Sequence, residues 1–290
     1  MTPTLAGKTF EWGTRTYIMG IINATPDSFS GDGLIAKGGD WIAAAVAQGI
    51  QQEKDGADIL DVGGESTRPS STPVSLEEEL ARVIPVIEGL AKKVSIPISI
   101  DTYKSEVARQ AIRAGASIIN DVWALKADSA IADVAREFNA PLILMHNHSE
   151  PKHAAQSDGL GGRYVGIEYG NLMSDIKSEL EKSVGTALKA GVARENIIVD
   201  PGIGFGKTVE QNLELIFRLR ELKTLGFPVL VGPSRKSFLG YTLNLPPEER
   251  LEATAAAVAL CIERGADIIR VHDVKAMHRV AKLADAIVRR

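Results

Sequence analysis

The stretch GADIIRVHDV, residues 265–274, combines an apolar run with two side chains that can carry positive charge. Its β-branched residues favour a buried strand. Arg270 and His272 lie two positions apart, so in a strand they project from one face with their stems roughly 7 Å apart. Asp273 projects from the opposite face and is not the expected partner of Arg270. The pair predicts a binding site for an anion where this strand ends.

Polar side chains also end the other apolar runs of the chain. These groups are Asn23, Glu65, Ser66, Thr67, Arg68, Asp101, Asn120, His146, Asn147, Asp200, Ser234, Arg235 and Lys236. Any one of them could instead cap a helix or satisfy loop backbone groups. A polar group at every strand end favours a shared ligand site over separate caps.

The types of these side chains indicate a ligand with two chemically different ends. Asp101, Asp200 and Asn120 suit a neutral heterocycle that carries N–H donors and acceptors. Four other groups suit an anion: Arg68, Lys236, Arg270 and His272. The expected substrate therefore has a hydrogen-bonding ring and a negatively charged group.

Eight apolar runs alternate with helical periods, which predicts the elements that position these groups. The runs are residues 16–23, 57–64, 96–102, 117–122, 141–147, 196–202, 228–234 and 267–273. Alternating strands and helices predict an α/β fold with a parallel sheet. Eight units favour a closed (β/α)8 TIM barrel over an open doubly wound sheet, with the chemistry at the carboxyl ends of the strands.

We expect a single domain. Residues 1–15 would be an N-terminal segment that closes the barrel base, and residues 16–290 would form the barrel. Long loops are expected at residues 24–39 and 147–166, on the side of the barrel that carries the chemistry.

Helix boundaries are also readable from the sequence. Ser75 and Glu78 have the spacing of a capping box, and Pro85 is expected to kink or interrupt the helix that follows. Glycines that end helices before a strand are Gly56, Gly115, Gly191, Gly226 and Gly265.

Composition excludes several classes of protein. The chain has 290 residues, of which 44% are hydrophobic and 24% charged, as in globular proteins. Its formal net charge of -4 argues against a general nucleic-acid binder. Cys261 is a lone cysteine, which fits a reducing compartment and a buried helix face. We found no pattern of a signal peptide or a membrane span, and we expect a cytoplasmic protein.

Two further motifs have weaker support. PGIGFGKT, residues 201–208, resembles a phosphate loop, but Pro201 stands where the Walker pattern requires glycine. The sequence also lacks a complete dinucleotide-binding glycine pattern there. His146, His148 and His153 could suggest zinc, but their spacing matches no strong zinc pattern and favours ordinary loop histidines.

Taken together, the motifs resemble those of the dihydropteroate synthase family. They are, in this order, MGIINATPDSFSGDG, DVGGESTRP, SIDT, IIND, DPGIGFGK, SRKSFLG and RVHDV, and the likeness covers about residues 16–285. The resemblance implies a barrel that condenses 6-hydroxymethyl-7,8-dihydropterin diphosphate with 4-aminobenzoate, with Mg²⁺ as cofactor. It also implies a homodimer that is a target of sulfonamides.

The resemblance assigns roles by motif. Asp101, Asn120, Asp200 and Lys236 would hold the pterin. Asn23 would meet the Mg²⁺–diphosphate, and Arg270 and His272 would complete the anion site. Thr67, Arg68, Phe205 and Ser237 would lie near the aminobenzoate. On this interpretation Arg270 serves the diphosphate, and binding of a pterin that lacks diphosphate should not need it.

Two positions depart from the family pattern, and two alternatives remain open. The first loop has its second acid at Asp32, displaced by one residue, and Ser70 stands where many members have glycine. One alternative is a barrel that binds a methylated folate and transfers its methyl group, but such a barrel would not need ESTR, SRKS and RVH. The other is a relative that binds pterin without catalysis. Turnover of the two substrates distinguishes all three.

Overall fold

The computed structural model describes residues 4–5, 8–25, 40–66, 73–150, 153–157 and 159–289. The predictions for Thr67, Arg68, Asp32 and Ser70 therefore lie outside the described residues.

Eight parallel strands form one sheet that curves into a nearly closed barrel. In spatial order they are β10 (Ile197–Asp200), β7 (Leu142–Met145), β6 (Ile118–Asp121), β5 (Ile98–Asp101), β4 (Ile59–Gly63), β3 (Tyr17–Asn23), β12 (Ile268–Val271) and β11 (Leu230–Val231). A parallel bridge between Val199 and Val229 joins the two ends of this order, and Val199 N donates to Pro228 O at 3.0 Å. The predicted (β/α)8 barrel is confirmed.

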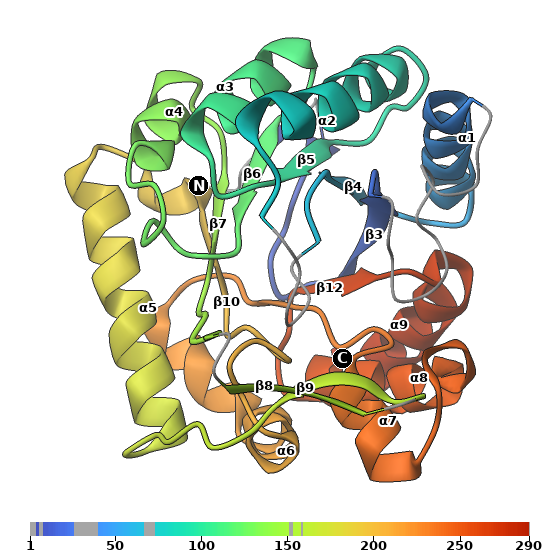
Figure 1. Ribbon diagram of the computed structural model, residues 1–290, viewed down its shortest axis with the longest axis vertical. Helices are drawn as coiled ribbons and strands as arrows, with labels where there is room; N and C mark the ends of the chain where they lie inside the picture. Colours follow the sequence, from blue (N-terminus) through green and yellow to red (C-terminus); the bar gives the residue numbers. More distant parts are fainter. Residues whose placement is uncertain are drawn as a thin grey trace.

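Helices surround the strands (Figure 1). They are α1 (Trp41–Lys54), α2 (Leu76–Ala91), α3 (Ser105–Ala114), α4 (Ile131–Glu137), α5 (Leu172–Lys189), α6 (Val209–Phe217), α7 (Ser237–Leu243), α8 (Leu251–Glu263) and α9 (Val274–Val288). Short 3-10 helices span Arg194–Asn196, Leu219–Leu225 and Pro247–Glu249.

The predicted helix signals are largely confirmed. Ser75 caps α2 by accepting from Glu78 N at 3.1 Å, but Glu78 pairs with Arg82 rather than completing the capping box. Of the kink or interruption expected at Pro85, the interruption is wrong, because α2 continues through this residue, and the kink stays a prediction. All five helix-ending glycines have positive φ, as an αL C-terminus requires.

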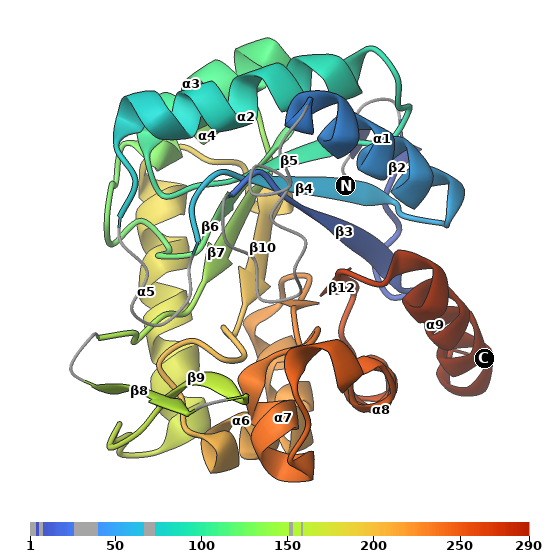
Figure 2. The ribbon, with the colours of Figure 1, turned by 45° about the vertical axis from the view of Figure 1, so that its right-hand side comes forward.

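Two antiparallel hairpins lie outside the barrel sheet. One joins β1 (Thr4–Leu5) to β2 (Lys8–Thr9). The other joins β8 (Ala154–Ser157) to β9 (Gly161–Tyr164) and falls within the predicted loop 147–166. Figure 2 shows β9 beside α7, on the opposite side of the molecule from α2 and α3.

The apolar core has two parts, as a barrel requires. The larger part lies between strands and helices. The smaller part fills the barrel interior with Phe10, Tyr17, Met19, Ile59, Ile118, Ile143, Ile198, Leu230 and Ile268. Phe10 belongs to this inner part and packs against Trp12 and Tyr17. This packing supports the proposal that residues 1–15 close the barrel base.

Candidate active site

The candidate site begins where the apolar interior of the barrel ends. Side chains alternate between the two faces of a strand, so the residue two positions after an inward apolar residue also points inward. Four strands place a polar group at that second position: Ile59 with Asp61, Ile118 with Asn120, Ile198 with Asp200, and Ile268 with Arg270. A polar layer therefore covers the apolar one at the carboxyl ends of the strands.

Arg270 links the acidic groups of this layer. Its Nε donates to Asp61 Oδ2 at 2.6 Å, and its Nη2 donates to Asp101 Oδ2 at 2.8 Å. Asn120 Nδ2 also donates to Asp61 Oδ2, at 3.1 Å. Asp273 pairs instead with Arg235, at 2.6 and 2.9 Å. As predicted, Asp273 is not the partner of Arg270.

Asp61 is a site residue that the sequence did not reveal. It is fully buried, and its Oδ1 has no hydrogen-bond partner among the described residues. Burial raises the pKa of nearby Asp101 to about 7, with Asp61 adding to the shift and Arg270 opposing it. The only signal for Asp61 was its place two residues after Ile59, inside a run that otherwise reads as apolar.

Asp200 begins a tightly held turn between β10 and α6. Its Oδ1 accepts from Gly202 N at 2.7 Å, and burial raises its pKa. Lys207 closes the turn, donating to Gly202 O at 2.9 Å and to Phe205 O at 3.0 Å. Lys207 is 2% exposed, so its ammonium group acts inside the protein.

Lys236 reaches the same turn from the segment before α7. Its Nζ donates to Ile203 O and lies 4.0 Å from the ring centroid of Phe205. Burial lowers the pKa of Lys236 to about 7. Ser237 follows as the first residue of α7. The structure thus brings Phe205 of one motif next to Lys236 and Ser237 of another. The resemblance predicted all three, and residue type had also marked Lys236, as an anion-binding group.

His272 directly follows the last residue of β12 and contacts Ser234, in the segment after β11. Its Nδ1 is 3.0 Å from Ser234 Oγ, and its backbone N donates to the same oxygen at 3.2 Å. Ser234 is therefore a support for His272.

Asn23 ends β3, opposite Gly63 in the register of the sheet, and its side chain is half-buried. Mg²⁺ is usually held by one or two protein oxygens together with substrate phosphates and waters. The amide oxygen of Asn23 fits such a ligand set.

A second group of potential metal ligands lies behind the β10–α6 turn. His146, His148 and Glu179 place ligand atoms within 4.8 Å of one another. Glu179 is already paired with Lys126 and His148, each at 2.6 Å. Lys207 Nζ lies 3.0 Å from His146 Nδ1, whereas a metal-bound histidine donates its second ring N–H to an acceptor. These contacts favour a hydrogen-bonding network over a metal site.

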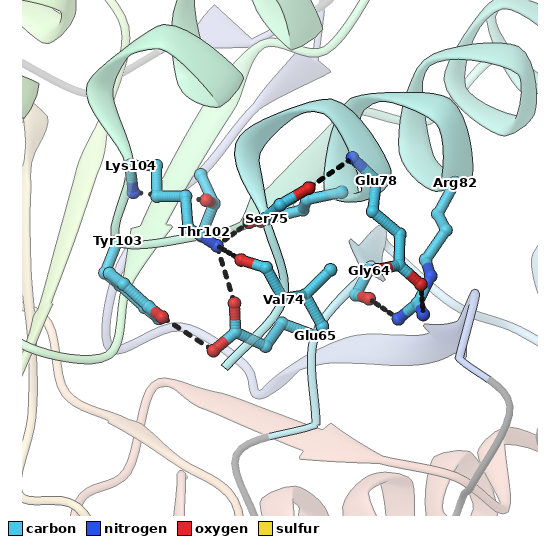
Figure 3. A network of polar contacts seen from close by, with 10 residues as sticks. Gly64, Glu65, Val74, Ser75, Glu78, Arg82, Thr102, Tyr103 and Lys104 are labelled. Carbon is cyan, nitrogen blue, oxygen red and sulfur yellow. Dashed lines mark hydrogen bonds and ion pairs between the residues drawn. The ribbon is translucent and has the colours of Figure 1, made fainter. Parts of the chain in front are cut away.

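A charged cluster holds the ends of β4 and β5 (Figure 3). Lys104 Nζ donates to Glu65 Oε2 at 2.6 Å, to Glu79 Oε2 at 2.5 Å and to Val74 O at 2.9 Å. Tyr103 donates its hydroxyl hydrogen to Glu65 Oε1 at 2.6 Å. Lys104 thus joins the end of β4 to the segment that leads into α2.

Comparison with known proteins agrees with this geometry. A family model described as "Pterin binding enzyme" matches residues 19–272. A dihydropteroate synthase of Clostridium beijerinckii is 50% identical over 287 residues, which cover 99% of each chain.

Two solved structures have the same fold. Xanthomonas albilineans dihydropteroate synthase with 4-aminobenzoic acid has a TM-score of 0.86 and 39% identity, covering 99% of this chain and 98% of that one. Yersinia pestis dihydropteroate synthase with a sulfonamide drug has a TM-score of 0.88 and 36% identity, with the same coverage.

The barrel, its polar layer and the family match define a pterin binding enzyme. The identity over nearly the full chain places it in the dihydropteroate synthase family, as the motif resemblance predicted. Members of this family are transferases. Among the described residues, no helix is long and apolar enough to cross a lipid bilayer.

Proposed function

We propose that the protein condenses 6-hydroxymethyl-7,8-dihydropterin diphosphate with 4-aminobenzoate, giving 7,8-dihydropteroate and diphosphate in folate biosynthesis. The observation that carries this proposal is a set of ring-binding and anion-binding groups at one end of a barrel. They are Asp101, Asn120, Asp200, Lys236 and Arg270. The family match supports the same conclusion.

The pterin ring binds to the acids and the amide of the polar layer. Asp200 can accept two hydrogen bonds from an amide and an amino N–H of the ring. Asp101 and Asn120 are paired in the register of β5 and β6, so both can form hydrogen bonds with the same edge of the pterin ring. Lys236, whose charge acts on Asp200, donates to a ring acceptor.

The diphosphate binds beside Arg270, His272 and Asn23. Nε and Nη2 of Arg270 hold Asp61 and Asp101, so Nη1 is the nitrogen that we assign to a phosphate oxygen. Asn23 would hold Mg²⁺, which would neutralise charge on the diphosphate. The end of the eighth strand is a common phosphate position in barrels.

The 4-aminobenzoate binds near Phe205 and Ser237, with Thr67 and Arg68 contributing from outside the described residues. Phe205 supplies an aromatic face next to Lys236. The Xanthomonas structure with 4-aminobenzoic acid and the Yersinia structure with a sulfonamide support binding of such ligands in this family. Sulfonamides are therefore expected inhibitors that compete with 4-aminobenzoate.

The chemistry requires electrostatic stabilisation rather than a protein nucleophile. The C–O bond to diphosphate breaks, the pterin carbon becomes cationic, and the arylamine nitrogen forms the new C–N bond and releases a proton. Negative charge grows on the leaving diphosphate, so contacts from Arg270 and His272 strengthen in the transition state. The remaining polar groups orient the two substrates.

We also propose a cytoplasmic location, which the lone Cys261 supports, and a homodimer, which the family supports. Mg²⁺ is the metal that we propose.

Product formation tests the proposed function and separates it from the alternatives. The protein is incubated with both substrates and Mg²⁺, and 7,8-dihydropteroate is identified by mass spectrometry. We expect the product only when both substrates are present, and less of it when a chelator removes Mg²⁺. Pterin binding without product would indicate a non-catalytic relative. Methyl transfer from a folate to a corrinoid protein would indicate the methyltransferase.

A further inference from the structure

Arg250 is a fully buried arginine that contacts no carboxylate among the described residues. It lies between α7 and α8, and its guanidinium donates to backbone oxygens of three separate segments. Nη1 contacts Arg235 O, Nη2 contacts Leu160 O, and both Nε and Nη2 contact Leu245 O, each at 3.0 Å. Burying such a charge without a contacting acid is costly. Burial lowers the pKa of Arg250, and the charge of Glu248 opposes this shift. The position of Arg250 indicates that it holds these segments together.

One of the three segments leads directly into the candidate site. Arg235 has φ of +54°, in the left-handed region that non-glycine residues rarely adopt. Its N donates to Thr254 Oγ1 at 3.0 Å, and its O accepts from Arg250 at 3.0 Å. The residue before it contacts His272, and the residue after it is Lys236. Arg250 therefore contacts the backbone segment that carries Lys236 and the residue that contacts His272.

A second segment is the turn of the β8–β9 hairpin, which supplies the carbonyl of Leu160. The hairpin has its own contacts with α7. Tyr241 donates its hydroxyl hydrogen to Gly161 O at 3.0 Å, and the guanidinium carbon of Arg163 lies 4.5 Å from the centroid of the Tyr241 ring. Figure 2 shows β9 lying along α7. The hairpin is thus docked on the helix that begins directly after Lys236.

We propose that Arg250 and the β8–β9 hairpin form a brace that fixes the backbone of residues 234–237 and so aims Lys236 at the substrate. Arg250 is a positioning residue, because it is buried behind the site and acts through Arg235. The brace gives the long segment after β7 a role in the reaction. This inference rests on the proposed function, since it takes Lys236 as a substrate contact.

Kinetics of Arg250→Ala with chemical rescue test the brace. We expect kcat/KM for the pterin diphosphate to fall by about 10–10², the size of effect that misplacing a site group produces. Methylguanidine should restore part of this loss, because it can refill the three carbonyl contacts. Arg264→Ala is the matched control, since Arg264 also donates to a backbone oxygen, Phe217 O, at the far end of α8. Wild-type kinetics in folded Arg250→Ala would overturn the proposal, as would a loss that methylguanidine does not reduce.

Amide hydrogen exchange tests the brace independently of the reaction. We expect residues 234–240 to exchange faster in Arg250→Ala, with the strands on the other side of the barrel unchanged. Unchanged exchange at residues 234–240 would overturn the brace even if the wild type makes no dihydropteroate. Failed turnover by the wild type, with the expected exchange pattern, would overturn the proposed function instead. If Arg250→Ala does not fold, Tyr241→Phe takes its place: faster exchange at residues 234–240 supports the brace, and unchanged exchange overturns it.

Discussion

Arg270 connects ring binding to anion binding at the scale of single residues. Its guanidinium contacts buried Asp61 and half-buried Asp101 in addition to any phosphate. We expect Arg270→Ala to lower kcat/KM by about 10²–10³. It should also weaken a pterin that lacks diphosphate, because Asp101 loses its cationic partner. Steady-state kinetics and calorimetry with the bare pterin measure the two effects.

Arg270→Lys is the matched variant, because lysine keeps the charge and loses the planar fork that spans two carboxylates. It should weaken the bare pterin less than Arg270→Ala does. Unchanged affinity of the bare pterin in Arg270→Ala would show that the ion pairs do not order Asp101.

The contacts of Arg270 also mark the limit of sequence reasoning at this scale. Spacing along one strand correctly excluded Asp273 as the partner of Arg270, because Asp273 pairs with Arg235. The common face of Arg270 and His272 stays a prediction. The partners of Arg270 come from β4 and β5, more than 160 residues away in the chain. No local pattern encodes such pairing, so the sequence predicted an arginine that serves the anion alone.

At the scale of elements, Lys104 joins the ends of β4 and β5 to α2 through half-buried Glu65 and buried Glu79. Glu79 is 1% exposed, so removing Lys104 leaves a buried carboxylate without its cation. We expect Lys104→Met to lower the free energy of unfolding by about 3 kcal/mol. Urea denaturation measures the change.

The control is an exposed ion pair. Arg136 and Asp133 lie 3.1 Å apart with more than half of each side chain exposed, so Arg136→Met should cost about 1 kcal/mol or less. Adding Glu79→Gln to Lys104→Met should recover part of the loss, since the uncompensated charge is removed. Equal costs for Lys104→Met and Arg136→Met would contradict a structural role for the cluster.

The β10–α6 turn should make stability depend on pH through Lys207. Burial lowers the pKa of Lys207 to about 7 in the folded protein, against about 10.4 in an unfolded chain. Between these pH values the unfolded chain binds more protons, so the free energy of unfolding rises with pH. Lys207→Met removes this group, and we expect a smaller rise between about pH 7 and pH 10.

Urea denaturation at several pH values measures the slope. Burial also lowers the pKa of Lys236, so the variant should keep part of the rise. Lys182→Met is the control, because Lys182 is exposed and should leave the slope unchanged. A wild-type slope in Lys207→Met would mean that Lys207 does not titrate in this range.

Elements with a strong local signal were predictable, and elements stabilised by docking were not. The eight strands are apolar, β-branched runs, and all eight are present. The β8–β9 hairpin has the sequences AAQS and GGRY, without an alternating apolar pattern, and is held by contacts with α7. The helix α2 continues through Pro85 because buried Val83, Val86 and Ile87 keep its apolar face against the barrel on both sides.

At the scale of the whole molecule, the barrel has an inner apolar layer that stabilises the fold and a polar layer that binds the ligand. Side chains alternate between the two faces of a strand, and this alternation determines which apolar residues point into the barrel. The polar layer is formed by the residues two positions later on the same strands. Length and strand count therefore predicted the architecture, and residue type at the strand ends predicted the chemical class of ligand. The supporting groups also have partners that are distant in the chain: Lys207 contacts His146, and Arg250 donates to the carbonyl of Leu160.

The central claim is that the polar layer binds the pterin, with Asp200 as its main anchor. Calorimetric titration of a pterin analogue into the wild type and Asp200→Asn tests it most directly. The substitution exchanges an acceptor for a donor and leaves ring N–H groups mispaired, so we expect affinity to fall by about 2–4 kcal/mol. Asp133→Asn, at an exposed site on α4, should bind like the wild type. Equal affinity of the wild type and Asp200→Asn for the analogue would contradict the account.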